Sequence, residues 1–483
     1  MVALLASAGA RADVGVILND SLDTSVARIT GSGHTAVYLS RICPASPIKL
    51  RLCRPGEQGS VISNYTTLGE DQPFEWNIVP LNVYVYGVEN PADRPLFASP
   101  KIKRALEEAY REKILADYCQ SENCRTSGNA EWREMVSAES ERTFYILIAA
   151  TTVEQDQKLI DEFNSLPNVN HFNGMTHNCA DFAKHIIDMY FPHAAHRDPI
   201  NDFGMTSPKA VARSFAHWAH DHPDAQYRVV HFAQLPGTIK RSSECRSGTE
   251  QLYHSKKLLV PMAVFGPHEL GIVTGSYLLT GRFNIQREFE QHATIRETEL
   301  GQQLKSAKDD DEPEIADELK ARETRERADV LGTEEQWKDF QAQFDSIVEE
   351  TVQDGRLGGR DALGHVFEKI NAKGEPFLDD RGELWMDVRE DDGRVARVGL
   401  TPSNILADGS DRTLAYQVIL ANVNDVLKSP ARRRETLPEF KETWQLLQSA
   451  RAEMPVEVAS ERRPSLSGRI ALISGFHSLR NRF

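Results

Sequence analysis

Two short motifs carry the residue types that nucleophilic catalysis requires. Gly33-His34 opens a β-type run, and Asn178-Cys179 opens a helical pattern. A thiol is a good nucleophile only as a thiolate, and its pKa of about 8.5 falls at a helix N-terminus or beside an imidazolium. A histidine on a rigid strand can serve as base and then as acid. These patterns predict Cys179 as a nucleophile and His34 as its base.

The residues next to Cys179 have opposing effects on its predicted reactivity. Asn178 is expected to support the site, with the first N–H groups of the helix as oxyanion donors. Asp181 opposes ionisation, because a nearby carboxylate raises the pKa of a thiol. A structural explanation also exists for each motif alone: a free cysteine is often a small buried hydrophobe, and a strand histidine is often only hydrogen-bonded.

The order of the motifs, with histidine on an early strand and Asn-Cys on a later helix, resembles the circularly permuted papain-like thiol hydrolases. This superfamily includes NlpC-type cell-wall peptidases and the lecithin:retinol acyltransferase branch. The resemblance covers residues 30–190 and implies an α+β fold with an antiparallel sheet, the base role for His34 and the nucleophile role for Cys179. The acyltransferase branch has a second histidine soon after the first, whereas no histidine lies between His34 and His171 here. The third catalytic residue is therefore unknown, with Glu57 or a backbone carbonyl as candidates, unless it is absent.

Composition limits the classes of partner. The 483 residues suffice for two or three domains, and 40% apolar with 26% charged residues is an ordinary globular balance. A net charge of −15 argues against nucleic acid as a partner. Nine of the fifteen histidines lie between His171 and His231, but no HExxH motif is present, so a histidine-rich surface is the simpler interpretation. We expect no cofactor and no metal.

Features near the N-terminus and the cysteine spacing favour export from a bacterial cell to the periplasm or medium. Residues 1–12 contain an apolar run and a small-x-small site, as in a signal peptide, although a short buried N-terminal strand has the same composition. Two cysteine pairs are spaced so that each can close a small loop by a disulfide in an oxidising compartment. These pairs are Cys43 with Cys53 and Cys119 with Cys124.

The pattern predicts a papain-like domain over residues 13–295, a polar helical region with an acidic linker over 296–355 and a small α+β domain over 356–483. Residues 258–279 contain charges, so buried strands are favoured over a membrane span. The expected strands are 34–39, 48–53 (paired with 34–39), 79–88, 144–150, 227–232 and 258–265, with a hairpin over 383–400. The expected helices are 100–118, 152–164, 178–190, 207–219 and 414–427, with another after a capping box at 333–336.

The favoured function is attack on the carbonyl of a peptide, amide or ester substrate, with cell-envelope peptides as the preferred class if the protein is exported. Two alternatives remain open: a non-catalytic envelope binding or structural protein that keeps the fold, and a lipid acyltransferase or acylhydrolase. The sequence predicts no membrane span after the signal peptide and leaves the oligomeric state open.

Overall fold

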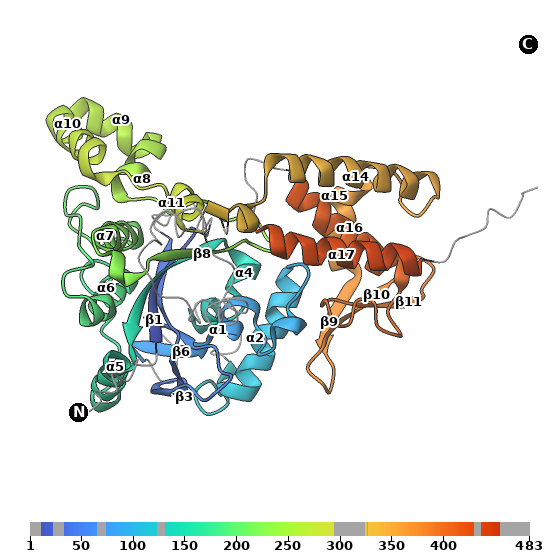
Figure 1. The fold of residues 1–483 in the computed structure, drawn as a ribbon, viewed down its shortest axis with the longest axis horizontal. Coiled ribbons are helices and arrows are strands. Elements are labelled where there is room, and N and C mark those ends of the chain that lie inside the picture. Colours follow the sequence, from blue (N-terminus) through green and yellow to red (C-terminus); the bar gives the residue numbers. More distant parts are fainter. Residues whose placement is uncertain are drawn as a thin grey trace, which may run out of the picture.

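A six-stranded antiparallel sheet forms the centre of the computed structural model (Figure 1). Its strand order is β6-β5-β2-β1-β7-β8. The strands are β1 (Arg11–Asn19), β2 (His34–Leu39), β5 (Ser60–Asn64), β6 (Trp76–Pro80), β7 (Phe144–Thr152) and β8 (Arg228–Phe232). The structure describes residues 11–22, 33–64, 74–122, 131–293, 324–325, 327–428 and 436–454.

Helices cover both faces of this sheet, which explains why its central strands are buried along their length. One face packs against α5 (Val153–Ser165), α6 (Cys179–Tyr190), α7 (Pro208–His220) and α11 (Ile285–His292). The other face packs against α1 (Leu81–Tyr86), α2 (Pro100–Ile114) and α4 (Ala138–Glu141). Each side chain of a strand therefore points into one of two apolar layers.

The second half of the chain adds a helical layer with a three-stranded sheet of order β11-β10-β9. Its elements are α14 (Glu334–Gln353), α15 (Ala362–Lys373), β9 (Gly374–Leu378), β10 (Leu384–Arg389), β11 (Val395–Gly399), α16 (Arg412–Leu427) and α17 (Leu437–Glu453). It contacts the first half through stacked Phe97 and Phe367, whose ring centroids are 5.2 Å apart. The ion pair of Arg241 with Asp425 adds a polar contact.

Three helices project from the body beside α7 and α11 (Figure 1). They are α8 (Gly248–His254), α9 (Lys256–Phe265) and α10 (Pro267–Ser276). The prediction of buried strands over 258–279 is wrong, because these residues are helical and mostly exposed. The apolar run fits either element type, and its periodicity does not distinguish them.

Most of the predicted helices and strands are present in the structure. The mixed α+β class with antiparallel sheets is confirmed, as are the helices α2, α5, α6, α7, α14 and α16, the strands β2, β7 and β8 and the β10–β11 hairpin. The strand over 79–88 is wrong: β6 ends at Pro80 and α1 follows. The pairing of 48–53 with 34–39 is also wrong, since β4 (Lys49–Leu52) pairs with β3 (Ile42–Ser46) and β2 pairs with β1 and β5.

The N-terminal boundary of the folded chain also differs from the prediction. Arg11 and Ala12, placed in the signal peptide by the sequence, are the first two residues of β1 and pair with Thr152 and Thr151. Ala12 is buried. The signal-peptide prediction for residues 1–10 and the acidic linker over 296–323 lie outside the described residues.

One predicted disulfide is present between Cys43 and Cys53. It joins β3 to the residue after β4 and closes that hairpin. Cys119 is also disulfide-bonded, while Cys124, its predicted partner, lies outside the part of the chain that the structure describes. The remaining thiols, Cys179 and Cys245, are free.

Removing the first disulfide should destabilise the fold through the entropy of the unfolded chain. For a sequence separation of 10, the chain-entropy relation gives a loss of about 2–3 kcal/mol in the free energy of unfolding. Cys43→Ala, Cys53→Ala and the double variant should lose similar amounts in urea titrations, because any of them removes the bond. Additive losses in the double variant would contradict this expectation.

Candidate functional site

The first residues of β2 and α6 lie together, although more than a hundred residues separate them in the sequence. The backbone N–H of Thr35, the residue after His34, donates a hydrogen bond to the sulfur of Cys179. Helix α6 packs on β2 through Ala183 and Ile186, which share an apolar cluster with Val37. The predicted nucleophile therefore contacts the backbone beside the predicted base.

Asn178 sets the start of α6 at Cys179. Its Oδ1 accepts hydrogen bonds from the N–H groups of Ala180 (2.8 Å) and Asp181 (3.1 Å). The carboxylate of Asp181 in turn accepts from the N–H of Asn178 at 3.3 Å, which completes a capping box. Two of the N–H groups expected to stabilise an oxyanion are thus occupied by the cap, and the N–H of Cys179 itself is the remaining candidate.

The other end of the Asn178 side chain connects two loops. Its Nδ2 donates to the carbonyl oxygens of Gly174 (3.2 Å) and Thr206 (3.0 Å). Both amide hydrogens are therefore engaged, so this geometry favours a structural supporting role for Asn178 over oxyanion donation.

Asp181 has partners that offset the effect expected from the sequence. The guanidinium of Arg197 lies 2.7 Å from its Oδ1, and the hydroxyl of Thr206 donates to the same atom at 2.5 Å. Because these donors compensate the carboxylate, the negative charge near Cys179 is paired.

His34 is the first residue of β2 and follows a glycine that the fold requires. Gly33 has φ +64°, and a Cβ there would lie 2.3 Å from the carbonyl oxygen of Asn19. Alternation along β2 directs His34 to the face of Ala36 and Tyr38, whereas α6 covers the opposite face. His34 therefore points to the face opposite α6, and it is the backbone of the next residue, Thr35, that reaches the Cys179 sulfur.

The ring of His34 has a partner that sequence reasoning did not identify. Its Nε2 lies 2.8 Å from the hydroxyl of Ser63, which is fully buried on the neighbouring strand β5. The sequence gives no clear signal for Ser63, because Ser60 and Asn64 on the same short strand are also polar. Recognising it requires knowing that β5 pairs with β2.

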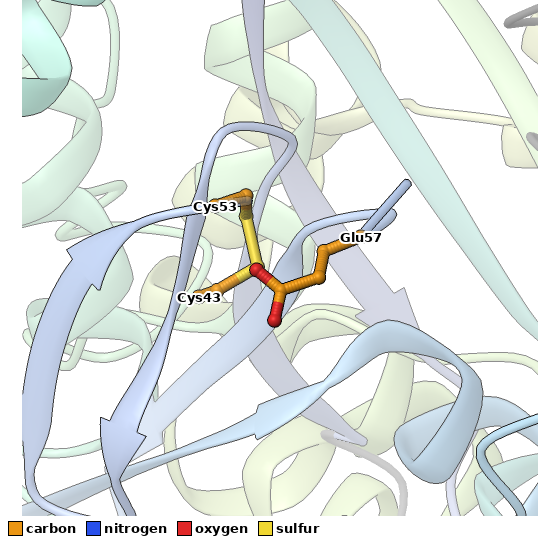
Figure 2. A group of neighbouring side chains, drawn as sticks. All are labelled: Cys43, Cys53 and Glu57. Atoms are coloured by element: carbon orange, nitrogen blue, oxygen red, sulfur yellow. A yellow bond between two sulfur atoms is a disulfide. The ribbon is translucent and has the colours of Figure 1, made fainter. Parts of the chain in front are cut away.

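Glu57, the weak candidate for the third residue, lies elsewhere. Its carboxylate forms a bidentate ion pair with Arg51 (2.7 Å to each oxygen), which lowers its pKa to about 2. Figure 2 shows it beside the disulfide of Cys43 and Cys53. The structure therefore brings Ser63, and not Glu57, to the imidazole of His34.

Burial controls the ionisation of both predicted catalytic groups. Desolvation raises the pKa of Cys179 to about 11, although the backbone N–H groups of Thr35 and Ala180 oppose the shift. Desolvation, followed by the positive charge of Arg142, lowers the pKa of His34 to about 3. The expected depression of the thiol pKa is thus wrong, because the loss of solvent outweighs the helix N-terminus. Both groups are neutral at pH 7.

Two further clusters contain residue types that bind metals. The ligand atoms of His220, Glu288 and His292 lie within 4.8 Å of one another, a donor set that suits zinc. The Nε2 of His220 already lies 2.7 Å from the carboxylate of Glu288, so an ion pair accounts for this contact. The second cluster is Cys43, Cys53 and Glu57, in which the sulfurs are joined as a disulfide and the carboxylate binds Arg51.

A hollow of about 440 Å³ lies on the C-terminal sheet, among different residues from those around Cys179. Its lining includes Trp385, Phe377 and Arg397, and the guanidinium lies 4.9 Å from the centroid of the Phe377 ring. Arg397 is also paired with Asp387 at 2.7 Å. These contacts account for the charge of Arg397 without a ligand, and the hollow is also lined by Asp379 and Asp408.

Comparison of the chain with protein-family models, curated proteins and solved structures gives no significant match.

The raised thiol pKa predicts alkaline reactivity. Because only the thiolate reacts, the rate of iodoacetamide labelling at Cys179 should rise about tenfold per pH unit between pH 7 and pH 10. Site-resolved mass spectrometry measures this rate, with the buried Cys245 as an internal control that stays unlabelled in the folded protein. A rate already at its maximum at pH 6–7 would instead show a thiolate–imidazolium pair.

Loss of the Asn178 side chain should cost more than loss of an ordinary cap. We expect Asn178→Ala to lower the free energy of unfolding by about 2–3 kcal/mol, because it removes the cap and leaves two loop carbonyls without their donor. Thr152→Ala, which removes the exposed cap of α5, should cost about 1 kcal/mol. Equal losses in denaturant titrations would show that the two loop contacts add nothing.

Proposed function

We propose that the protein is a thiol hydrolase or acyltransferase in which Cys179 attacks an amide or ester carbonyl and His34 transfers the proton. The observation that supports this proposal is the hydrogen bond from the N–H of Thr35, the residue after His34, to the Cys179 sulfur. Ser63 is a positioning residue in this proposal, because its hydroxyl lies 2.8 Å from Nε2 and holds the imidazole there. A permuted papain-like arrangement, with the histidine strand before the cysteine helix, is part of the same proposal.

The proposed reaction needs only the thiol of Cys179, the imidazole of His34, the substrate and an acceptor such as water. The thiol proton moves to His34 as the sulfur–carbon bond forms, and the N–H of Cys179 faces the developing oxyanion. The carbon–nitrogen or carbon–oxygen bond then breaks, and the leaving group takes the proton from the imidazolium. Water or another acceptor releases the acyl group from the sulfur.

The two pKa values argue against a preformed ion pair, and the gap between them opposes proton transfer from the thiol to the imidazole until substrate binds. With the thiol pKa near 11 and the imidazole pKa near 3, the ground state holds S–H and neutral imidazole. A bound substrate that shields the thiolate and imidazolium together lowers the energy of the charged pair only during attack. Such a protein has low thiol reactivity until substrate binds.

Exposed apolar side chains on the two loops that Asn178 connects favour a lipid acyl ester over a peptide as the substrate. Met175 is 57% exposed and Phe203 is 46% exposed, on the two loops that Asn178 connects. Ile200, on the second loop, is 47% exposed. Exposed apolar side chains on both loops suit an acyl chain better than the polar backbone of a peptide.

The disulfides support export as part of this proposal, since such bonds persist in oxidising compartments. A periplasmic or extracellular location places both candidate substrate classes, envelope peptides and lipid esters, within reach of the protein.

Hydrolysis of p-nitrophenyl acetate and p-nitrophenyl palmitate tests the roles. Cys179→Ser should abolish turnover, and His34→Ala should lower kcat at least a hundredfold because the proton acceptor is lost. Ser63→Ala should lower kcat about tenfold at unchanged KM, with the loss shrinking in Ser63→Thr, which keeps the hydroxyl.

Glu57→Gln is the matched control, because its carboxylate binds Arg51 away from the site, and its activity should equal that of the unaltered protein. Turnover that survives in Cys179→Ser would rule out the proposed nucleophile. A preference for the palmitate ester supports the lipid candidate, whereas a preference for the acetate opposes it.

A further inference from the structure

The projecting pair of helices α9 and α10 exposes apolar side chains on several sides. None of the ten residues of α9 is buried, although eight of them are apolar. Seven large apolar side chains of this region are at least half exposed: Leu258, Val260, Val264, Phe265, Ile272, Leu278 and Leu279. Such helices need apolar surroundings that this chain's described residues do not supply.

Polar contacts hold only the base of this pair. Tyr277 donates to the carboxylate of Glu250 at 2.8 Å, and Glu250 pairs with Lys209 on α7 at 2.9 Å. The amide of Asn201 reaches the hydroxyl of Ser276 at 3.3 Å. The base is thus fixed to the loop and helix next to Cys179, while the apolar part extends away from the body (Figure 1).

We propose that α9, α10 and the π-helical turn Tyr277–Gly281 form a hairpin that embeds in a lipid bilayer and attaches the protein to its surface. Among the described residues no single helix is long and apolar enough to cross a membrane, but α9 and the segment Pro267–His292 pass the same test together, with a bend of 118° between them. This proposal does not depend on the chemistry of Cys179.

Length and charge decide how the hairpin lies. The ten residues of α9 span about 15 Å, half of a hydrocarbon core of about 30 Å, so α9 is too short to cross the bilayer. His268 and Glu269 at its turn are ionisable and exposed, which favours a position along the headgroup boundary over perpendicular insertion.

The charges at the base identify the lipid class. Lys256, Lys257 and Arg282 flank the apolar stretch and are exposed, and Glu269 is the one acidic residue between them. This segment is positive in a chain whose net charge is −15. Anionic headgroups therefore attract the base of the hairpin, although the rest of the protein repels them.

Flotation of the full chain with vesicles tests the proposal. We expect the protein to float with vesicles of phosphatidylcholine and phosphatidylglycerol at 7:3 and to bind at least threefold less to pure phosphatidylcholine. Phe265→Asp/Leu279→Asp should reduce the bound fraction at least tenfold, because both side chains are more than 85% exposed in the unbound structure.

Leu166→Asp/Val395→Asp is the matched control: both side chains are more than half exposed, lie outside the hairpin, and should leave binding unchanged. Cys179→Ser should also bind like the unaltered protein, which separates this proposal from the proposed function. Lack of flotation, or equal flotation of the hairpin variant, overturns the proposal. A third outcome also overturns it: light scattering shows a dimer of the unaltered protein and a monomer of the hairpin variant, and neither protein binds vesicles. A second copy of the chain would then cover the hairpin.

Discussion

The contact between the start of β2 and the start of α6 is the constraint on which the candidate site depends. The Thr35 N–H reaches the Cys179 sulfur only because the helix packs along the strand through small and branched apolar side chains. The cap at Asn178 then fixes which residue is the first of the helix. A shift of one residue at either start would rotate the thiol away from the strand end.

Burial at the candidate site favours fixed positions of Cys179 and His34 but opposes their ionisation. The packing of α6 on β2 also removes water from the thiol and the imidazole, and each group becomes harder to charge. The same desolvation strengthens the hydrogen bond between His34 and Ser63. The side chains of the candidate site are therefore held in fixed positions and are uncharged at rest. This combination suits a reaction that begins only when substrate binds.

Exposed apolar side chains on the loops near the site link the proposed lipid substrate with the hairpin. The loops joined by Asn178 expose Met175 and Phe203, and the base of α10 contacts the second loop through Asn201. A protein attached to a bilayer by this hairpin would carry its thiol close to the membrane surface. Acyl esters of that membrane are then the nearest carbonyl groups.

The sequence by itself determined the local features: the Asn178 cap, the helix that starts at Cys179, the strand that starts at His34 and the disulfide of Cys43 and Cys53. These depend on neighbouring residues, whose propensities and spacing are visible along the chain. The α+β class follows from the same patterns.

Only the tertiary structure decided what those features do. Strand pairing brought Ser63 to His34 and left Glu57 with Arg51, and no pattern within either segment encodes which strands are neighbours. Burial reversed the expected shift of the Cys179 pKa, because desolvation comes from residues far away in the sequence. Likewise, the apolar run from Leu258 reads equally well as a buried strand or an exposed helix, and the absence of packing partners among the described residues settled the choice.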